Sequence, residues 1–332
     1  MRFAVLGAGA IGAFVGARLA EGGADVVLIA RGEHLDAMRR DGVRLIADGG
    51  ERAVAVPATD ALEAIADADV VIVALKAYSL PAIAPRLGAL LRKDAATVWA
   101  QNGIPWWYFQ CHGPPLDGHT LESVDPGGVI AASVPAESVV GAVVYIAAEL
   151  ERPGVVRFVE GRRLTLGEPD GSASARAGAI SDALQAGGLR APVTEDLRSE
   201  IWLKLLGSAT FNPISALTGA TLGQLGALPE MLGVLRAIME ECTGVAEALG
   251  ATLRISVDRR LEAGIEVGDH KTSMLQDLEA GKPLELDCIT GAVIEIADRL
   301  GIAVPHTRTV HACAKLLDLR TATTAPPRVP AA

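Results

Sequence analysis

Short apolar runs and segments with helical spacing alternate along the first hundred residues. Residues 3–6 and 24–30 are apolar runs of the length expected for buried strands. Between them, apolar side chains recur at the spacing of one helix face: Ile11, Phe14, Val15 and Leu19. Residues 70–75 and 97–100 form two further runs, each preceded by a segment of helical character. Repeated strand and helix units of this kind predict a parallel sheet with right-handed crossovers.

The middle of the chain is rich in β-forming residues. Three such segments follow one another: 139–147, 155–159 and 163–167. Pro153 and Gly154 suit a turn between the first two, so we expect these segments to complete the sheet as a hairpin-like edge. Residues 173–186 return to helical spacing, and residues 189–193 predict one last strand.

The pattern changes near Thr194, which suits a helix N-cap because acidic residues follow it. Beyond it the strand signals fade and long helical segments dominate: 195–217, 229–249 and 284–300. We therefore predict an N-terminal α/β domain over residues 1–193, a Rossmann-type doubly wound parallel sheet, and an all-helical C-terminal domain over 194–322. Residues 323–332 carry several prolines and predict a flexible tail.

Composition agrees with two soluble domains. The 332 residues exceed one ordinary core, and half of them are apolar while only 4% are aromatic, as is usual for buried parallel sheets. The formal net charge of −10 argues against a nucleic-acid partner, and no apolar run is long enough for a membrane helix. The four cysteines show no paired spacing and the N-terminus resembles no signal peptide, which favours a cytoplasmic location.

A glycine-rich turn joins the first strand to the first helix. It reads Gly7, Ala8, Gly9, Ala10, Ile11 and Gly12. In this context the glycines permit a tight turn, a close approach to a pyrophosphate and close packing of helix on strand, while the first helix amides bind the anion. A glycine-rich turn without a ligand is the alternative.

Arg31 stands at the end of the second strand, where NAD enzymes usually carry an acid that binds the adenosine ribose. An acid would repel a ribose phosphate, whereas an arginine can pair with it. The residue therefore favours NADPH over NADH, unless it is only a solvated surface arginine.

Two more strands are followed by polar residues. Lys76 follows the run 70–75, and Asn102 with Gly103 follows the run 97–100. Ligands bind at the carboxyl ends of strands in open α/β sheets, so these residues agree with the glycine loop, although each is common after a strand.

In the second domain, Lys204, Ser208 and Asn212 recur every four residues on one face of a predicted helix. A lysine, a hydroxyl and an amide in a row could hold a carboxylate and a carbonyl oxygen. The same spacing is also typical of the polar outer face of an amphipathic helix. Farther on, Ser273 and Glu285 lie in a polar stretch, and Glu285 is expected to open the last long helix.

Together these residues resemble the ketopantoate reductase (2-dehydropantoate 2-reductase) family over most of the chain. The glycine loop, the lysine after one strand and the Asn-Gly after the next match its marks. More specific are WLKLLGSATFNPISALTG around Lys204 and SMLQDLEAGKPLELDCITG around Ser273 and Glu285. They are similar to the family signatures WxK…NxxxNP and SMxxDxxxGxxxEID.

The resemblance implies a reaction: reduction of 2-dehydropantoate to pantoate, in pantothenate biosynthesis, by hydride transfer from NADPH to the C2 carbonyl. It implies two catalytic residues: Lys204, as the proton donor, and Glu285, at the junction of cofactor and substrate. The implied cofactor-binding residues are the glycine loop, Arg31, Lys76, Asn102 and Glu285. The implied substrate-binding residues are Asn102, Lys204, Ser208, Asn212 and Ser273.

Three features depart from the family pattern. Ser208 and Thr290 stand where asparagines are usual, and the aromatic segment 106–128 (beginning WWYFQCHGPP) is an insertion after Asn102. A lost amide contact discriminates between substrates more sharply than a methylene does. Reduction of a different branched or bulky 2-oxo acid is therefore the second candidate function.

Other classes of protein stay open. A non-catalytic NADP-binding sensor would need only the first domain, although Lys204 and Glu285 argue against it. A metal site could use His and Cys in two groups, without the spacing typical of zinc: Cys111, His112 and His119, or His306, His311 and Cys313. The apolar helix 231–249 could serve a homodimer interface as readily as a core.

Overall fold

The computed structural model describes residues 1–47 and 49–324. It divides into two compact units. Unit 1 comprises Met1–Gln101, Trp106–Thr120 and Gly127–Leu197, and unit 2 comprises Asn102–Pro105, Leu121–Pro126 and the chain from Arg198 onward. The chain enters unit 2 for good after Leu197, and two short earlier segments also belong to it. Of the expected tail, residues 325–332 lie outside the described residues.

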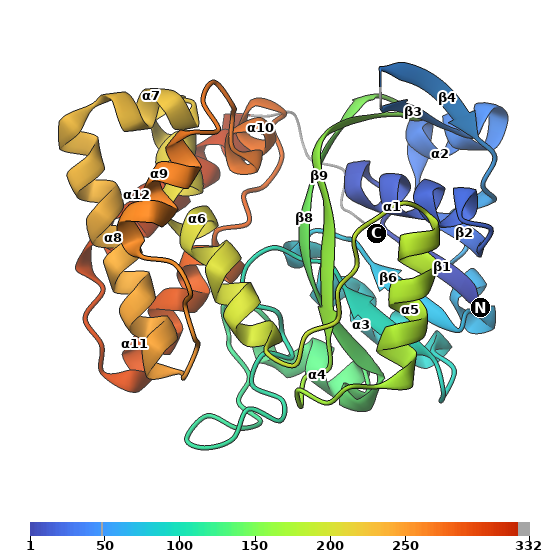
Figure 1. Cartoon of the computed structure of the whole chain (residues 1–332), viewed down its shortest axis with the longest axis horizontal. Helices are drawn as coiled ribbons and strands as arrows, with labels where there is room; N and C mark the ends of the chain where they lie inside the picture. Colours follow the sequence, from blue (N-terminus) through green and yellow to red (C-terminus); the bar gives the residue numbers. More distant parts are fainter. Residues whose placement is uncertain (48, 325–332) are drawn as a thin grey trace. The chain divides into compact units, whose positions relative to one another are not determined.

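Unit 1 is built on a nine-stranded sheet with the order β4-β3-β9-β8-β7-β6-β1-β2-β5 (Figure 1). The strands are β1 (Arg2–Leu6), β2 (Asp25–Ile29), β3 (Val43–Ala47), β4 (Gly50–Val54), β5 (Ala58–Thr59), β6 (Val70–Val73), β7 (Ala96–Trp99), β8 (Val139–Arg152) and β9 (Val155–Gly167). Strand β1 pairs in parallel with both β2 and β6, and the parallel array continues through β7 to β8. Strands β1, β2, β6 and β7, which the apolar runs predicted, are buried at nearly every position, as expected for strands covered on both faces.

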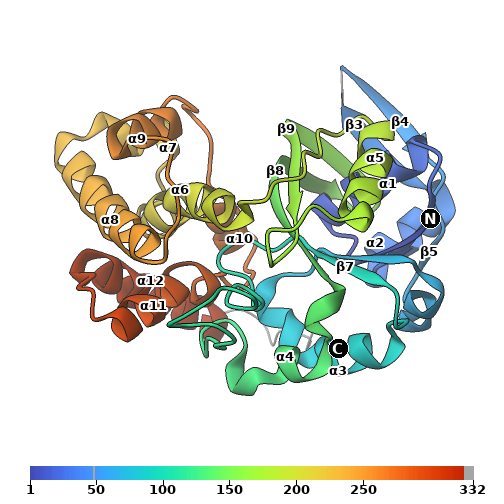
Figure 2. The same cartoon turned by 60° about the horizontal axis from the view of Figure 1, so that its bottom comes forward.

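In the described part of unit 1, five α-helices accompany this sheet: α1 (Ala10–Glu21), α2 (Gly32–Asp41), α3 (Leu80–Leu90), α4 (Val129–Ser133) and α5 (Ala175–Ala186). Helices α1 and α5 lie side by side in both views, and α3 packs against α4 (Figures 1 and 2). A continuous core joins Phe3 of β1, Leu19 of α1 and Ile180 of α5. The expectation of a doubly wound, mostly parallel α/β sheet is confirmed.

The expected hairpin-like edge was wrong in its position. Strands β8 and β9 do form an antiparallel hairpin, but β9 also pairs in parallel with β3, so the hairpin lies inside the sheet. The edge is β4, because residues 43–54 form the antiparallel pair β3 and β4. The two segments expected at 155–159 and 163–167 form one continuous strand, β9, whose pairing with β8 is irregular near Tyr145 of β8. The strand expected at 189–193 forms only isolated bridges.

The aromatic segment 106–128 leaves the sheet, as expected. Its first four aromatic side chains are buried, and Trp106 packs edge to face on Trp99 at 5.3 Å between ring centroids. A Cβ added to Gly141 of β8 would lie 2.4 Å from the Trp107 ring, so this strand needs a glycine to accept the indole. The aromatic residues that open the segment therefore pack within unit 1.

Unit 2 is helical (Figure 2). Its helices are α6 (Leu197–Thr218), α7 (Leu222–Ala227), α8 (Pro229–Ala248), α9 (Val257–Ile265), α10 (Ser273–Glu279), α11 (Ala292–Leu300) and α12 (Pro305–Thr324), of which α6 begins on the last residue of unit 1. Helix α8 packs against α9, α11 and α12 and buries Leu235, Ile238 and Met239. The helix expected from residue 284 instead begins with a π-helical turn, Asp287–Gly291, that leads into α11.

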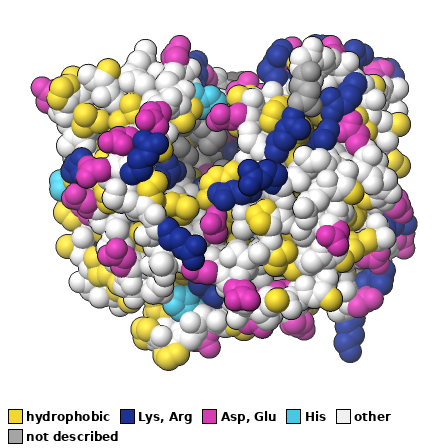
Figure 3. Space-filling model, viewed as in Figure 1, with side chains coloured by type: hydrophobic (Ala, Val, Ile, Leu, Met, Phe, Trp, Pro, Cys, Tyr) yellow, Lys and Arg dark blue, Asp and Glu magenta, His cyan; other side chains and the backbone are white. Residues whose placement is uncertain are grey.

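Basic side chains gather over the β8–β9 hairpin on the face shown in Figure 3. Arg157 pairs with Glu151, whereas Arg162 and Arg163 lie over the rings of Phe158 and Tyr145. This face gives the acidic chain a local positive surface. The described residues include no helix that is long and apolar enough to cross a membrane.

Candidate active site

The glycine loop connects β1 to α1 in a tight turn. The amides of Gly7 and Ala8 both donate to the Ile29 carbonyl, at 3.1 and 3.0 Å. Gly7 has a φ of +94°, and a Cβ added to Gly12 would lie 2.3 Å from the Gly7 carbonyl oxygen. Glycine is therefore required at both positions, for the turn and for the close approach of α1 to the strand end.

The start of α1 is suited to an anion. Gly9 is the N-cap, and its carbonyl accepts the amide of Ala13 at 2.8 Å. The preceding amides, of Ala10, Ile11 and Gly12, have no acceptor within the helix. A Cβ added to Gly9 would meet no atom within 4 Å, so space is open beside the loop. Free amides, a helix N-terminus and open space fit a pyrophosphate.

Arg31 and Lys76 follow strand ends of the same sheet. Arg31 is the N-cap of α2 and is exposed, and its guanidinium has no ion-pair or hydrogen-bond partner within the described part of the chain. Lys76 is half-buried and begins the turn after β6. The unpaired guanidinium of Arg31 is available to a ligand phosphate.

Gln101 is a polar residue that the sequence did not single out. Its Nε2 donates to the carbonyls of Val73 and Leu75, at 2.8 and 3.2 Å, and so ties together the ends of β6 and β7. Its Oε1 is buried and has no partner among the residues that the structure describes. A buried acceptor of this kind fits an N–H donor on a ligand. The sequence could have indicated Gln101 as a site residue, because it lies between a buried strand and Asn102.

In unit 2, the structure brings Lys204 and Asn102 together. The Nζ of Lys204 donates to Oδ1 of Asn102 at 2.6 Å, and both residues are half-buried. The short segment that contains Asn102 belongs to the helical unit although it directly follows a strand of the other unit. The sequence placed Asn102 at a strand end but gave no indication of this direct contact.

Ser208 and Asn212 follow Lys204 on α6, one and two turns later. Both are half-buried, so this row is not simply the outer face of the helix. The Ser208 hydroxyl lies 3.4 Å from the Lys204 carbonyl and 3.3 Å from that of Leu205. The Asn212 amide has no hydrogen-bond partner within residues 1–47 and 49–324. Asn212 is therefore the member of the row best able to bind a ligand.

Ser273 begins α10, and Glu285 follows this helix in the chain. Ser273 is exposed at the first position of that helix, whose N-cap is Thr272. Glu285 is buried and precedes the π-helical turn, so it does not open a regular helix as expected. The expectation failed because residues 282–286 form no regular secondary structure.

The π-helical turn holds the Asn102 segment. Within it, the Gly291 amide donates to the Leu286 carbonyl at 3.0 Å, a bond that spans five residues. The Cys288 carbonyl accepts the Ile104 amide at 2.8 Å. Gly103, between Asn102 and Ile104, has a φ of +82°, and a Cβ added there would lie 2.2 Å from the Cys288 carbonyl oxygen. The sequence gave no signal for this turn.

Thr290, one of the departures from the family pattern, is fully buried. Its hydroxyl lies 2.8 Å from Nδ1 of His311 on α12 and 3.3 Å from the Leu286 carbonyl. Burial lowers the pKa of His311 below its usual value. The hydroxyl is thus engaged by the protein.

The histidines and cysteines considered for a metal do not form a metal cluster. Within the described residues, no three His, Cys, Asp or Glu side chains are arranged to hold an ion. His306 instead contacts Glu241, with 2.7 Å between Nδ1 and Oε1.

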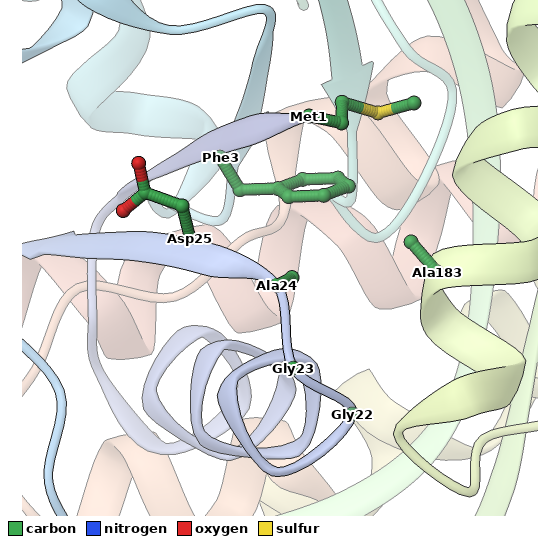
Figure 4. A pocket seen from close by; sticks show the side chains of 7 residues that line it. All are labelled: Met1, Phe3, Gly22, Gly23, Ala24, Asp25 and Ala183. Atoms are coloured by element: carbon green, nitrogen blue, oxygen red, sulfur yellow. The ribbon is translucent and has the colours of Figure 1, made fainter.

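A surface hollow of about 350 Å³ lies elsewhere in unit 1 (Figure 4). Met1, Phe3, Asp25 and Ala183 line it, together with the turn Gly22–Ala24. Ala183 lies on α5, and the other lining residues lie at the amino ends of β1 and β2, whereas the glycine loop follows the carboxyl end of β1. The hollow is therefore separate from the glycine loop.

Comparison with known proteins agrees with this fold. Residues 3–107 match the family "Ketopantoate reductase PanE/ApbA", and residues 196–318 match "Ketopantoate reductase PanE/ApbA C terminal". A 2-dehydropantoate 2-reductase of Mesorhizobium japonicum is 46% identical over 297 residues, which cover 89% of this chain and 91% of the relative.

Solved structures share the architecture. A Ralstonia solanacearum protein superposes with a TM-score of 0.91 at 38% identity, covering 96% of this chain and 98% of that one. D-mandelate dehydrogenase, solved with NADH and anilino(oxo)acetate, shares the fold with a TM-score of 0.82 at 23% identity, covering 97% and 99%. The fold and the family matches define an oxidoreductase. The chain belongs to the ketopantoate reductase family.

Proposed function

We propose that this enzyme reduces the C2 carbonyl of 2-dehydropantoate to the alcohol of pantoate, with NADPH as the reductant, as part of pantothenate biosynthesis. The observation that carries the proposal is the contact between Lys204 and Asn102, a cation held in place on a helix that also presents Asn212. Two relatives named 2-dehydropantoate 2-reductase, at 46% and 34% identity, support the choice of substrate.

Residues of unit 1 suit the cofactor. The amides of the glycine loop would hold the pyrophosphate, and Arg31 and Lys76 would meet its other anionic or polar groups. The unpaired guanidinium of Arg31 favours NADPH, because it can bind a 2′-phosphate that NADH lacks. Bound NADPH would supply the hydride that reduces the carbonyl carbon.

Residues of unit 2 suit the 2-oxo acid. Asn212, Ser208 and Ser273 offer an amide and two hydroxyl groups for the substrate carboxylate and its hydroxyl. Lys204, held by Asn102, donates a hydrogen bond to the carbonyl oxygen, stabilises the charge that develops there and then transfers a proton. Glu285, a buried carboxyl group, would complete the site at the junction of cofactor and substrate.

The direct test is NADPH oxidation, followed by absorbance, with 2-dehydropantoate and a panel of other 2-oxo acids. Wild type and Lys204→Ala are compared. Turnover of 2-dehydropantoate that the substitution abolishes is the expected result. An enzyme that binds NADPH but reduces no 2-oxo acid would contradict the proposal and favour a sensor.

A different branched or bulky 2-oxo acid is the second candidate substrate. Thr290 favours it, because the hydroxyl that replaces the usual asparagine is engaged by His311. Turnover confined to another member of the panel would keep the chemistry and change the substrate.

The proposal extends to location and assembly. We propose a cytoplasmic enzyme, because Cys111, Cys242, Cys288 and Cys313 are free thiols. We also propose a homodimer, since a dimeric ketopantoate reductase of Staphylococcus aureus shares the fold. Light scattering of the purified protein tests the second point: a mass of one chain would contradict it.

A further inference from the structure

His34, in the first turn of α2, uses both of its ring nitrogens on backbone groups of distant segments. Its Nε2 lies 2.7 Å from the carbonyl oxygen of Ala8 in the glycine loop. Its Nδ1 accepts the amide of Gly154, in the turn between β8 and β9, at 2.9 Å. One half-buried side chain thus joins three parts of unit 1.

The two partners fix the state of the ring. An amide N–H can only donate, so Nδ1 must be the acceptor, and the proton of the neutral imidazole is on Nε2. From there it is donated to the Ala8 carbonyl. Burial lowers the pKa of His34, in agreement with a neutral ring. A protonated ring would lose the acceptor that Gly154 needs.

The Gly154 turn is itself anchored. The Gly154 carbonyl accepts the amide of Arg44 at 2.9 Å. A Cβ added to Gly154, whose φ is +78°, would lie 2.7 Å from Cβ of Ala37 on α2. The hairpin turn and α2 are thus in close contact, and His34 connects this support to the glycine loop.

The position of His34 relates it to the nucleotide site. It follows Arg31, the N-cap of α2, by three residues. Its other end holds a carbonyl of the loop that offers free amides to the pyrophosphate. A carbonyl oxygen would repel a phosphate, so holding the Ala8 oxygen on His34 leaves the loop free to present its amides.

We propose that His34 is a positioning residue of the nucleotide site. Its Nε2–H bond to the Ala8 carbonyl fixes the position of the glycine loop relative to Arg31 at the start of α2. This inference rests on the proposed use of NADPH. The hydrogen bond from His34 is a support for the loop that the glycine pattern alone does not predict.

The test measures dissociation constants of NADPH and NADH, from the fluorescence of the reduced nicotinamide, for wild type and four variants. His34→Ala removes both bonds. His34→Gln can place an amide N–H near the position of Nε2, whereas His34→Asn can place an oxygen only near that of Nδ1. Asp36→Asn, at an exposed position of the same helix, is the matched control.

We expect His34→Ala and His34→Asn to bind NADPH about tenfold more weakly, the effect of one hydrogen bond, and His34→Gln and the control to bind within about threefold of wild type. Equal NADPH affinity of all variants would overturn the inference. So would wild-type affinity in His34→Asn together with weakened binding in His34→Gln. Wild type that binds neither nucleotide would overturn the proposed function as well, which separates the two failures.

A second measurement does not depend on the variants' folding. Long-range ¹H–¹⁵N correlation spectra of wild type labelled at histidine report the protonated ring nitrogen directly. We expect the Nε2–H tautomer at His34 at neutral pH, and the Nδ1–H tautomer would overturn the inference.

Discussion

The Nζ atom of Lys204 lies 2.6 Å from Oδ1 of Asn102, a residue 102 positions earlier in the chain. A lysine ammonium has three donors and no acceptor, so the bond to Asn102 uses one of its N–H groups. The amide oxygen also limits the directions in which the ammonium can point. A proton donor at Lys204 would therefore be oriented before its substrate binds.

Lys204→Met should lower kcat for 2-oxo acid reduction by about 10² to 10⁴, the range for removing a placed proton donor, with little change in NADPH affinity. Initial rates at saturating NADPH and fluorescence titration measure the two quantities. Lys282→Met, at an exposed position of the same unit, is the control and should keep wild-type rates. A Lys204 variant with normal kcat would exclude the residue as the donor.

Arg31→Ala should raise the KM for NADPH by about 10- to 100-fold, the effect of a lost charge-assisted bond, and leave the KM for NADH nearly unchanged. Arg40→Ala, also exposed on α2 but paired with Asp41, should change neither value. Equal losses for both nucleotides would show that Arg31 does not bind the 2′-phosphate.

Gly103→Ala should lower kcat by about 100-fold, because the methyl group would overlap the Cys288 carbonyl and displace Asn102. Gly113→Ala is a matched control: its φ of +85° is similar to the +82° of Gly103, but an added Cβ meets no atom within 4 Å. Both variants should melt at lower temperature because of backbone strain. If both lose activity equally, strain rather than the overlap with Cys288 is responsible.

Acid should destabilise the protein through His311. Burial lowers its pKa in the folded state relative to the ordinary value of 6.5, so the unfolded chain binds more protons between the two values. Stability from the neutral ring is full above about pH 6.5 and is lost as the pH falls toward the folded-state pKa. His311→Asn, which can still accept a bond from Thr290, should flatten the decline of Tm between pH 7 and 5. An unchanged decline would assign it to other groups.

Most of unit 1 could be predicted because its signals are local. The run Phe3–Leu6, the glycines after it and the helical spacing up to Leu19 each indicate their own conformation without knowledge of the rest of the chain. The pair β3 and β4 was missed because its exposed and half-buried positions, such as Glu51 and Arg52, interrupt the apolar pattern. Its place beside β9 depends on a partner about a hundred residues away.

The residues of the candidate site could be predicted from the sequence, but the contacts that hold them in position could not. Family resemblance pointed to Lys204 and Asn102, whereas the π-helical turn depends on an amide that arrives from Ile104. The bonds of His34 to Ala8 and Gly154 also join residues far apart in sequence. Such contacts form only once the chain has folded, so the periodicity of the sequence does not predict them.

Two segments of unit 2, Asn102–Pro105 and Leu121–Pro126, lie within the part of the chain that forms unit 1, and this affects whether the two units can be produced as separate fragments. A fragment ending at residue 197 would carry the Ile104 amide without the Cys288 carbonyl, and the amides of Glu122 and Ser123 without the Glu295 carboxylate that accepts both. The complementary fragment would keep the Cys288 carbonyl and the Glu295 carboxylate without the amides that donate to them. The halves are therefore expected to be recovered as folded protein only when they are produced together, as a split enzyme that reassembles.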